Sequence, residues 1–245
     1  MKNVIVILFV FPFLFVIGCK KEGSGSCFKG AKENGAITMD FHNFNSIALY
    51  DDINLEVQFG NNYEVELTGP KNLLEYCIIE LKGQTLIAEN FTKCYVTKGY
   101  DFSFKLKVTI PKLDSIYTDG YGNINFLDTL NQQTFKLENF GTAGVYNLLL
   151  NTSNVKIAHH LGSADIMIIG NSNTGEFFLG SNGRIDASNL YAKQAFVNHD
   201  GDGNVYTYAS DYLSYSLTSY GDLYTYGNPK IIEGTRKGKG NFFEP

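Results

Sequence analysis

The sequence predicts an all-β protein whose C-terminal half is a β-solenoid. In residues 113–245 a short phrase recurs, consisting of a small residue, usually glycine, a polar residue and then an apolar residue. The apolar members lie 18 to 21 positions apart and are Ile124, Val145, Ile166, Ile185, Val205, Leu223 and Phe242. A period of about twenty residues is typical of solenoids, in which each repeat forms one coil.

The composition supports the same fold class. The 245 residues include 25 Gly, 16 Tyr and 19 Phe but only 5 Pro, which suits β-strands joined by glycine turns. The net charge is -5, and Arg184 and Arg236 are the only arginines. Because a nucleic-acid-binding surface must be basic, we expect no nucleic-acid partner.

Residues 1–18 have the pattern of a lipoprotein signal peptide. Lys2 precedes an apolar run from Val4 to Ile17, and the following Gly18-Cys19 completes a match to the bacterial lipobox. This match predicts cleavage before Cys19 and acylation of that cysteine, including by palmitate, with residues 19–27 as the lipidated linker. We therefore expect a lipid anchor in the outer membrane, with the periplasmic or cell-surface side left open. The alternative is an ordinary transmembrane anchor.

Three further cysteines remain after Cys19, an odd number for an oxidising compartment. In residues 77–82 the alternation of apolar and polar residues places Cys77 on the apolar face, so we expect it to be a buried thiol. Cys27 and Cys94 lie in polar, loop-like segments. We therefore expect Cys27 and Cys94 to form a disulfide.

Residues 28–112 form an N-terminal β region with period-two strands but without the repeat. A hairpin is expected at Gly60-Asn61-Asn62, whose residues suit a tight turn. The expected strands are 53–59, 63–67, 77–81, 85–88 and 102–110.

In residues 113–245 each coil can bury its apolar face only against a neighbouring coil, so the β-helix repeats should share one core. The small residue allows a tight corner. The polar residue after it is expected to face water.

The chain also resembles the putative auto-transporter adhesin head GIN domain family (domain of unknown function 2807) of lipoproteins. The segments that carry the resemblance are 27–30, 44–47, 53–57, 72–74, 109–113, 120–124, 226–230 and 238–241. Where the family usually has Gly-Ser-Gly, this chain has Gly120-Tyr121-Gly122. The resemblance implies a right-handed parallel β-helix preceded by strands packed on it, with residues 28–245 as one domain. It implies an adhesion or envelope role and brings no catalytic residues.

No metal or cofactor is expected. Residues 200–204 resemble the start of a calcium loop, but Val205 stands where that loop needs glycine and Asp211 where it needs glutamate. His160 and His199 are each six residues before the apolar residue of their repeats, so we expect them to share one position, with Leu179 between them.

The tyrosines suggest a surface. Residues 205–208 and 223–226 align between neighbouring repeats, and each segment has tyrosine at its second and fourth positions. If Val205 and Leu223 face inward, an outward patch of four tyrosines results. The patch is either a stacked ladder that stabilises the solenoid or a binding surface for a glycan or an envelope protein. Its members are Tyr206, Tyr208, Tyr224 and Tyr226.

These observations predict a non-enzymatic cell-envelope lipoprotein with an adhesion, binding or structural role. The alternative is a carbohydrate-active β-helix enzyme, either a polysaccharide lyase or a glycoside hydrolase. Asp165 and Asp222 share a repeat position but lie three coils apart, about 14 Å. That separation exceeds the roughly 5–9.5 Å between paired carboxylates in glycosidases.

Overall fold

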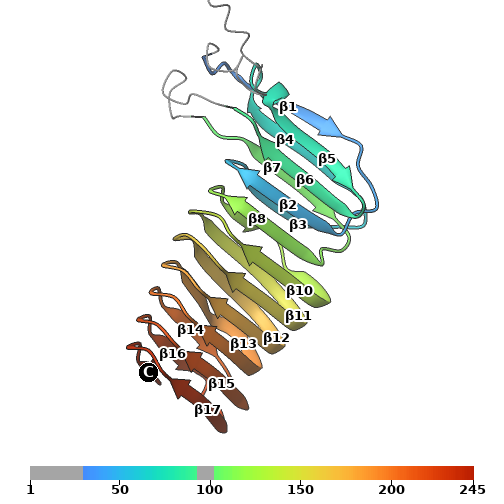
Figure 1. Cartoon of the computed structure of the whole chain (residues 1–245). Coiled ribbons are helices and arrows are strands. Elements are labelled where there is room, and N and C mark those ends of the chain that lie inside the picture. The colour runs from blue at the N-terminus through green and yellow to red at the C-terminus, as the bar shows by residue number, and fades with distance from the viewer. Residues whose placement is uncertain (1–29, 93–101) are drawn as a thin grey trace, which may run out of the picture.

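The computed structural model describes residues 30–92 and 102–245. In these two ranges, eighteen strands form one hydrogen-bonded sheet that winds into an elongated β-solenoid of about six turns (Figure 1). The all-β solenoid predicted from the sequence is therefore confirmed. Within the described ranges no helix has both the length and the apolar character needed to cross a membrane.

The described residues of the N-terminal part contain seven strands and one short 3₁₀ helix. In chain order they are β1 (Asn34–Met39), β2 (Ser46–Asp51), β3 (Asn54–Phe59), β4 (Glu64–Pro70), η2 (Leu74–Tyr76), β5 (Cys77–Lys82), β6 (Thr85–Asn90) and β7 (Lys105–Ile110).

The remaining strands form the coils. They are β8 (Ser115–Gly120), β9 (Ile124–Phe126), β10 (Leu130–Asn139), β11 (Val145–His159), β12 (Asp165–Leu179), β13 (Arg184–His199), β14 (Val205–Tyr208), β15 (Tyr212–Leu217), β16 (Leu223–Tyr226), β17 (Ile231–Arg236) and β18 (Phe242–Phe243).

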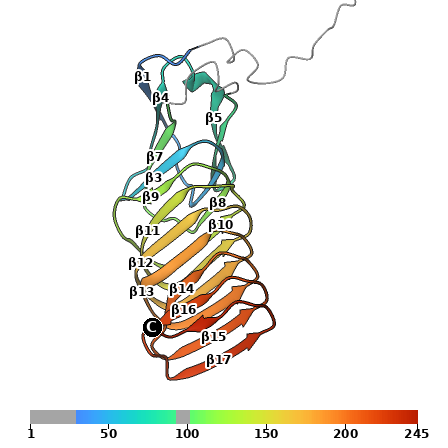
Figure 2. The same cartoon turned by 90° about the vertical axis from the view of Figure 1, so that its left-hand side faces the viewer.

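Successive coils add strands to two parallel ladders (Figure 2). Ladder A runs through β6, β2, β8, the C-terminal halves of β10 to β13, and then β15 and β17. Ladder B runs through β7, β3, β9, the N-terminal halves of β11 to β13, and then β14, β16 and β18. Alternate side chains of both ladders meet in a single core.

The N-terminal strands continue these ladders. β2 pairs in parallel with β8, and β3 pairs in parallel with β9, so β2 and β3 form a first coil. The hairpin predicted at Gly60-Asn61-Asn62 is wrong, because β7 lies between β3 and β4 and pairs with both. β1, β4 and β5 form antiparallel pairs beyond this coil, at the N-terminal end of the rod (Figure 1).

One repeat is shifted by a residue from its predicted register. Tyr146, and not Val145, aligns with Ile124 and Ile166 in ladder B. Tyr146 is fully buried, whereas Val145 is 41% exposed. Both residues can occupy a strand, so the spacing alone did not distinguish them. The tyrosine hydroxyl is accommodated in the core because it donates a hydrogen bond to Asn139 Oδ1 at 3.1 Å.

The histidine prediction is corrected in the same way. His159, and not His160, shares its position with Leu179 and His199. The segment from His159 to Ile166 is one residue longer than the corresponding segment from Leu179 to Ile185. His159 and His199 are buried, and the ring of His160 points outward and stacks on Phe140.

His159 belongs to a buried polar cluster. Its Nδ1 lies 2.9 Å from Asn139 Nδ2, and its Nε2 lies 3.1 Å from the carbonyl oxygen of Ala164. These contacts suit a neutral ring that accepts from the Asn139 amide and donates from Nε2 to Ala164. Burial lowers the pKa of His159 to about 4.

The polar residue of the repeated phrase bonds to the next coil. Asn123 Oδ1 accepts a hydrogen bond from the Val145 backbone N–H at 2.8 Å, and Asn204 Oδ1 accepts one from Asp222 N–H at 3.1 Å. Asp222 Oδ1 accepts from Asn241 N–H at 2.7 Å. These side chains therefore provide contacts between coils, beyond the solvent-facing role predicted for them.

The corner glycines are needed because neighbouring backbones approach each other closely. A Cβ on Gly203 would lie 1.6 Å from the carbonyl oxygen of Gly183, and one on Gly122 would lie 2.0 Å from that of Ile53. Neither glycine has a positive φ. The absence of a side chain, and not an unusual backbone conformation, therefore explains these two glycines.

The C-terminal end of the core is covered by three side chains. The ring of Tyr215 lies over Gly234 and stacks on Phe242, with 4.6 Å between the ring centroids. Arg236 takes the place of Leu217 in the last coil and donates to the carbonyl oxygen of Gly240 and to Asn241 Oδ1. A guanidinium group thus occupies a core-facing position at the end of the ladder.

Cys77 is a buried free thiol, as predicted. Burial, with a smaller contribution from Asp52, raises its pKa to about 12. Cys19, Cys27 and Cys94 lie outside the described residues. The Cys27–Cys94 disulfide therefore stays a prediction.

Gly203→Ala should destabilise the protein by about 3 kcal/mol or more, because its methyl group would overlap the Gly183 carbonyl. Denaturant unfolding followed by circular dichroism measures the change. Gly30→Ala is the control, since a Cβ there has no neighbour within 4 Å. Equal stability of the two variants would contradict the requirement for close approach.

The free energy of unfolding should fall by about 3 kcal/mol as the pH is lowered from 6.5 to 4, through His159 alone. In this window unfolded chains bind a proton at His159, and the folded protein does not because its pKa is about 4. Above pH 6.5 the His159 ring is neutral in both the folded and the unfolded protein, so the free energy of unfolding is not reduced there. Denaturant unfolding across this range measures the loss.

His159→Leu should remove most of this pH dependence, whatever its effect on stability at pH 7. Burial also lowers the pKa of His199, so a smaller dependence should remain. His42→Leu is the control, because the His42 side chain is 55% exposed. An unchanged pH dependence in His159→Leu would overturn this account of the cluster.

Candidate functional site

The outer face of ladder A carries an open groove of about 930 Å³. Its lining comes from six neighbouring strands of the ladder, from β10 to β17. The groove therefore runs across the strands, along the axis of the solenoid. Its volume falls within the range typical of ligand-binding pockets.

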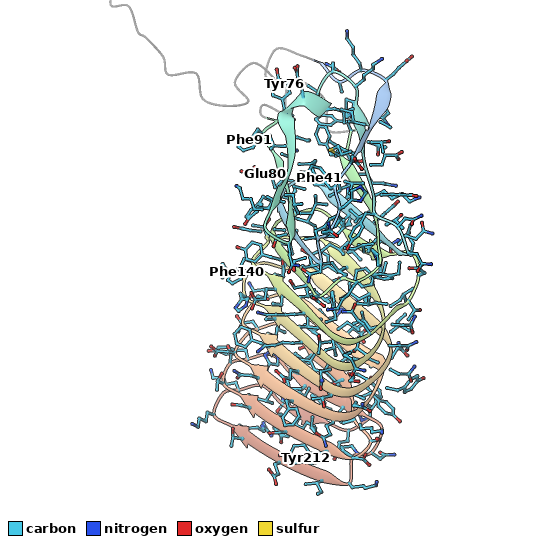
Figure 3. The ribbon with its side chains drawn as sticks, turned by 90° about the vertical axis from the view of Figure 1, so that its right-hand side faces the viewer. Phe41, Tyr76, Glu80, Phe91, Phe140 and Tyr212 are labelled. Carbon is cyan, nitrogen blue, oxygen red and sulfur yellow. The ribbon has the colours of Figure 1, made fainter. Side chains whose placement is uncertain are left out.

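Aromatic side chains lie in and beside one part of the groove: His160, Phe178 and Phe196 line it, and Phe140 and Tyr212 contact these from outside the lining. Phe140 projects outward beside the upper coils (Figure 3) and stacks on His160, with 4.2 Å between ring centroids and 8° between planes. Phe178 is tilted by 45° from His160, and Phe196 by 51° from Tyr212. Because both pairs are tilted, His160 does not lie flat on the ring of Phe178, and Tyr212 does not lie flat on the ring of Phe196.

The groove is acidic. Three carboxylates and one lysine line it, and each carboxylate contacts another side chain. Glu176 lies 3.7 Å from Lys156, and Glu138 lies 2.7 Å from Lys136, which is outside the lining. Tyr212 donates a hydrogen bond to Glu233 at 2.8 Å, and this bond raises the pKa of Tyr212.

Small polar residues lie beside these groups. Asn198, Ser216 and Thr235 are aligned on successive strands and face outward in the groove. They offer amide and hydroxyl groups that both donate and accept hydrogen bonds. The groove thus combines apolar rings with uncharged hydrogen-bonding groups and carboxylates.

The predicted tyrosine patch lies on ladder B. Tyr206 is aligned with Tyr224, and Tyr208 with Tyr226. Because the alternate residues Val205, Thr207, Leu223 and Thr225 are buried, the four tyrosines point outward. This is the arrangement expected from the repeat, and whether it binds a ligand stays a prediction.

The ring geometry of the patch favours stacking between coils. Tyr206 and Tyr224 are 4.8 Å apart with 11° between planes, and Tyr224 and Phe243 are 4.9 Å apart with 16° between planes. The ring faces in this stack therefore cover one another, which leaves mainly edges and hydroxyls toward solvent. Such stacks stabilise a fold without any ligand.

The acidic residues considered for an enzyme also have structural contacts. Asp165 forms an ion pair of 3.4 Å with Arg184 of the next coil, and Asp222 accepts the Asn241 N–H. Asp200 and Asp202, in the segment that resembles a calcium loop, accept hydrogen bonds from Thr218 and Ser219. In the described part of the chain, no group of three or more His, Cys, Asp or Glu residues is arranged to hold a metal ion.

Sequence reasoning did not find the groove, because the outward residues of ladder A differ from coil to coil and form no repeated phrase. One signal was present. Phe140, His160 and Phe178 are aromatic residues spaced 20 and 18 positions apart, close to the period of the repeat. The assignment of His160 to the wrong register concealed it.

Solved structures of similar fold include proteins from Bacteroides and Parabacteroides. A putative adhesin from Bacteroides fragilis NCTC 9343 is 21% identical with a TM-score of 0.73, covering 86% of this chain and 97% of that chain. A putative adhesin from Parabacteroides distasonis ATCC 8503 is 22% identical with a TM-score of 0.64, covering 87% and 97%. A putative lipid binding protein from the same strain is 18% identical with a TM-score of 0.61, covering 88% and 98%.

No protein of curated function matches the chain. The family model described as "Putative auto-transporter adhesin, head GIN domain" matches residues 43–229. This match includes the first coil, the antiparallel strands β4 and β5, and most of the solenoid. The chain belongs to the putative auto-transporter adhesin, head GIN domain family.

Proposed function

We propose that this protein is a non-enzymatic binding or adhesion module of the cell envelope. The observation that carries the proposal is the open groove on the outer face of ladder A. Its floor is a parallel ladder whose internal strands are paired on both sides, so the groove is formed on a rigid element. The family to which the chain belongs supports an adhesion role.

The carboxylates of the groove favour binding over hydrolysis. Glu138 and Glu176 are two strands apart, about 10 Å along the axis, and Glu176 and Glu233 are three strands apart, about 14 Å. Paired-carboxylate glycosidases use separations of roughly 5–9.5 Å. A carbohydrate-active enzyme is the second candidate, since carboxylates line a groove long enough for a sugar chain.

The proposed attachment is a lipid on Cys19. Removal of residues 1–18 would leave this cysteine at the new N-terminus, followed by the polar linker 19–27. Several acyl chains give stable anchoring, which one chain alone does not. The module would then be tethered to the outer membrane on its periplasmic or cell-surface side.

Cys19→Ser should abolish incorporation of labelled palmitate and move the protein out of the detergent phase in phase separation. Ser24→Ala, a change in the same linker, should leave both properties as in the wild type. The measurements are labelling in growing cells followed by fractionation. Palmitate incorporation into Cys19→Ser at the wild-type level would contradict the anchor.

The full chain, purified in detergent, should bind at least one member of a panel of polysaccharides, envelope proteins and lipid-coated beads without altering it. Chromatography of each polysaccharide after incubation measures turnover. A shortened or unsaturated product would establish the enzyme alternative. Absence of binding across the whole panel would contradict the binding role.

Replacement of Tyr206, Tyr208, Tyr224 and Tyr226 by serine separates the two roles of the tyrosine patch. A structural stack predicts a loss of about 0.5–1.5 kcal/mol for each ring pair and unchanged ligand binding. A binding surface predicts loss of binding to the panel member that the wild type recognises. Thermal unfolding and binding are therefore measured on the same preparation.

A further inference from the structure

We infer that the ladder A groove binds an uncharged linear carbohydrate whose chain lies along the axis of the solenoid. This inference rests on the proposed binding function and adds the site and the chemical class of the ligand. It is independent of the tyrosine patch, which lies on ladder B.

The shape of the groove requires an elongated ligand. Its lining extends over six strands of ladder A, so the groove is about 24 Å long at a strand spacing of about 4.8 Å. The pyranose rings of an extended glycan repeat at a similar distance. One sugar residue per coil would therefore meet an equivalent backbone position each time.

The direction of the groove argues against an extended peptide. Peptides often bind sheets by adding a strand, which needs an unpaired edge parallel to the peptide. Here the groove crosses the strands, and β10, β11, β12, β13 and β15 are each paired on both sides in ladder A. A peptide lying in it would find no backbone partners of that kind.

The side chains suit the two surfaces of a sugar. Phe178 and Phe196 are apolar groups in the groove; Phe178 is half-buried and Phe196 is 38% exposed. The tilted ring contacts leave aromatic surface on which the C–H face of a pyranose can pack. The tyrosine stack differs, because its nearly parallel rings cover one another.

Hydrogen-bonding groups lie beside those rings. Asn198 and Ser216 are neighbours on β13 and β15, and Glu233 lies on β17. An amide, a hydroxyl and a carboxylate can together donate to and accept from sugar hydroxyls. This mixture is what a polyhydroxylated ligand needs.

Charge repulsion argues against acidic polysaccharides in the groove, and the cost of removing water from its carboxylates argues against acyl chains. Three carboxylates face one lysine in the lining, and the chain has a net charge of -5, so acidic polysaccharides would be repelled. An acyl chain would displace water from the carboxylates of Glu138 and Glu176 without replacing their hydrogen bonds. A neutral glycan has neither cost.

Affinity gel electrophoresis of the full chain in non-ionic detergent tests the inference. The probes are three soluble neutral polysaccharides, hydroxyethyl cellulose, galactomannan and mixed-linkage β-glucan, with polygalacturonate as the acidic counterpart. At least one neutral probe should retard the wild type, and polygalacturonate should not.

Two variants locate the binding. Ser216→Trp fills the groove, and Phe196→Ser removes an aromatic surface, so each should weaken binding about tenfold or more. Asn154→Trp is the matched control, because Asn154 is an exposed residue of the same ladder outside the lining. Circular dichroism and thermal unfolding verify that each variant is folded.

Four results would overturn the inference. They are no retardation by any neutral probe, stronger retardation by polygalacturonate, unchanged binding in both groove variants, and binding lost only when the four tyrosines are replaced. A fluorescent fatty acid that binds the wild type but not the groove variants, in the absence of glycan binding, would assign the groove to lipid instead. If the protein bound an envelope protein and no glycan, the proposed binding function would stand and the inference of a carbohydrate ligand would be refuted.

Discussion

Close contact between the backbones of neighbouring coils governs this structure. At the corners, carbonyl oxygens approach the next coil so closely that Gly122 and Gly203 have no room for a Cβ. The residue after each of these glycines, Asn123 or Asn204, then accepts a backbone N–H of the following coil. The phrase that repeats in the sequence is thus the part of each coil that touches its neighbour. Alignment of the strands in both ladders follows from it.

The same stacking explains why aromatic residues gather in rows. Successive coils place equivalent side chains about 4.8 Å apart, close to the separation of stacked rings. Rows such as Tyr206, Tyr224 and Phe243 therefore form wherever a position stays aromatic, and their first effect is to hold coils together. A surface for a ligand arises more readily where the residue changes from coil to coil, as it does at Ala158, Phe178, Asn198 and Ser216.

The sequence was sufficient for the architecture but not for every register. The corner residues repeat because the close approach of neighbouring backbones restricts which residues fit there. The period of the solenoid is therefore visible in the sequence. A shift of one residue could not be detected from the spacing where two adjacent residues both suit the position, as Val145 and Tyr146 do, and His159 and His160. Such a shift exchanges the inner and outer faces of the strand. The partners of β3 are distant in the chain, so a local turn pattern at residues 60–62 suggested a hairpin that β7 prevents. The groove escaped notice because it depends on differences between repeats.

Rigidity links the scaffold to binding. In ladder A the outward side chains of the internal strands are attached to strands held by backbone hydrogen bonds on both sides, and the groove carboxylates are further fixed by Lys136, Lys156 and Tyr212. A ligand entering the groove would therefore order few side chains, so less of its interaction free energy would be lost to conformational entropy. Since shallow, open sites gain little from burial, this preorganisation is the property that makes binding on the outer face of a solenoid feasible.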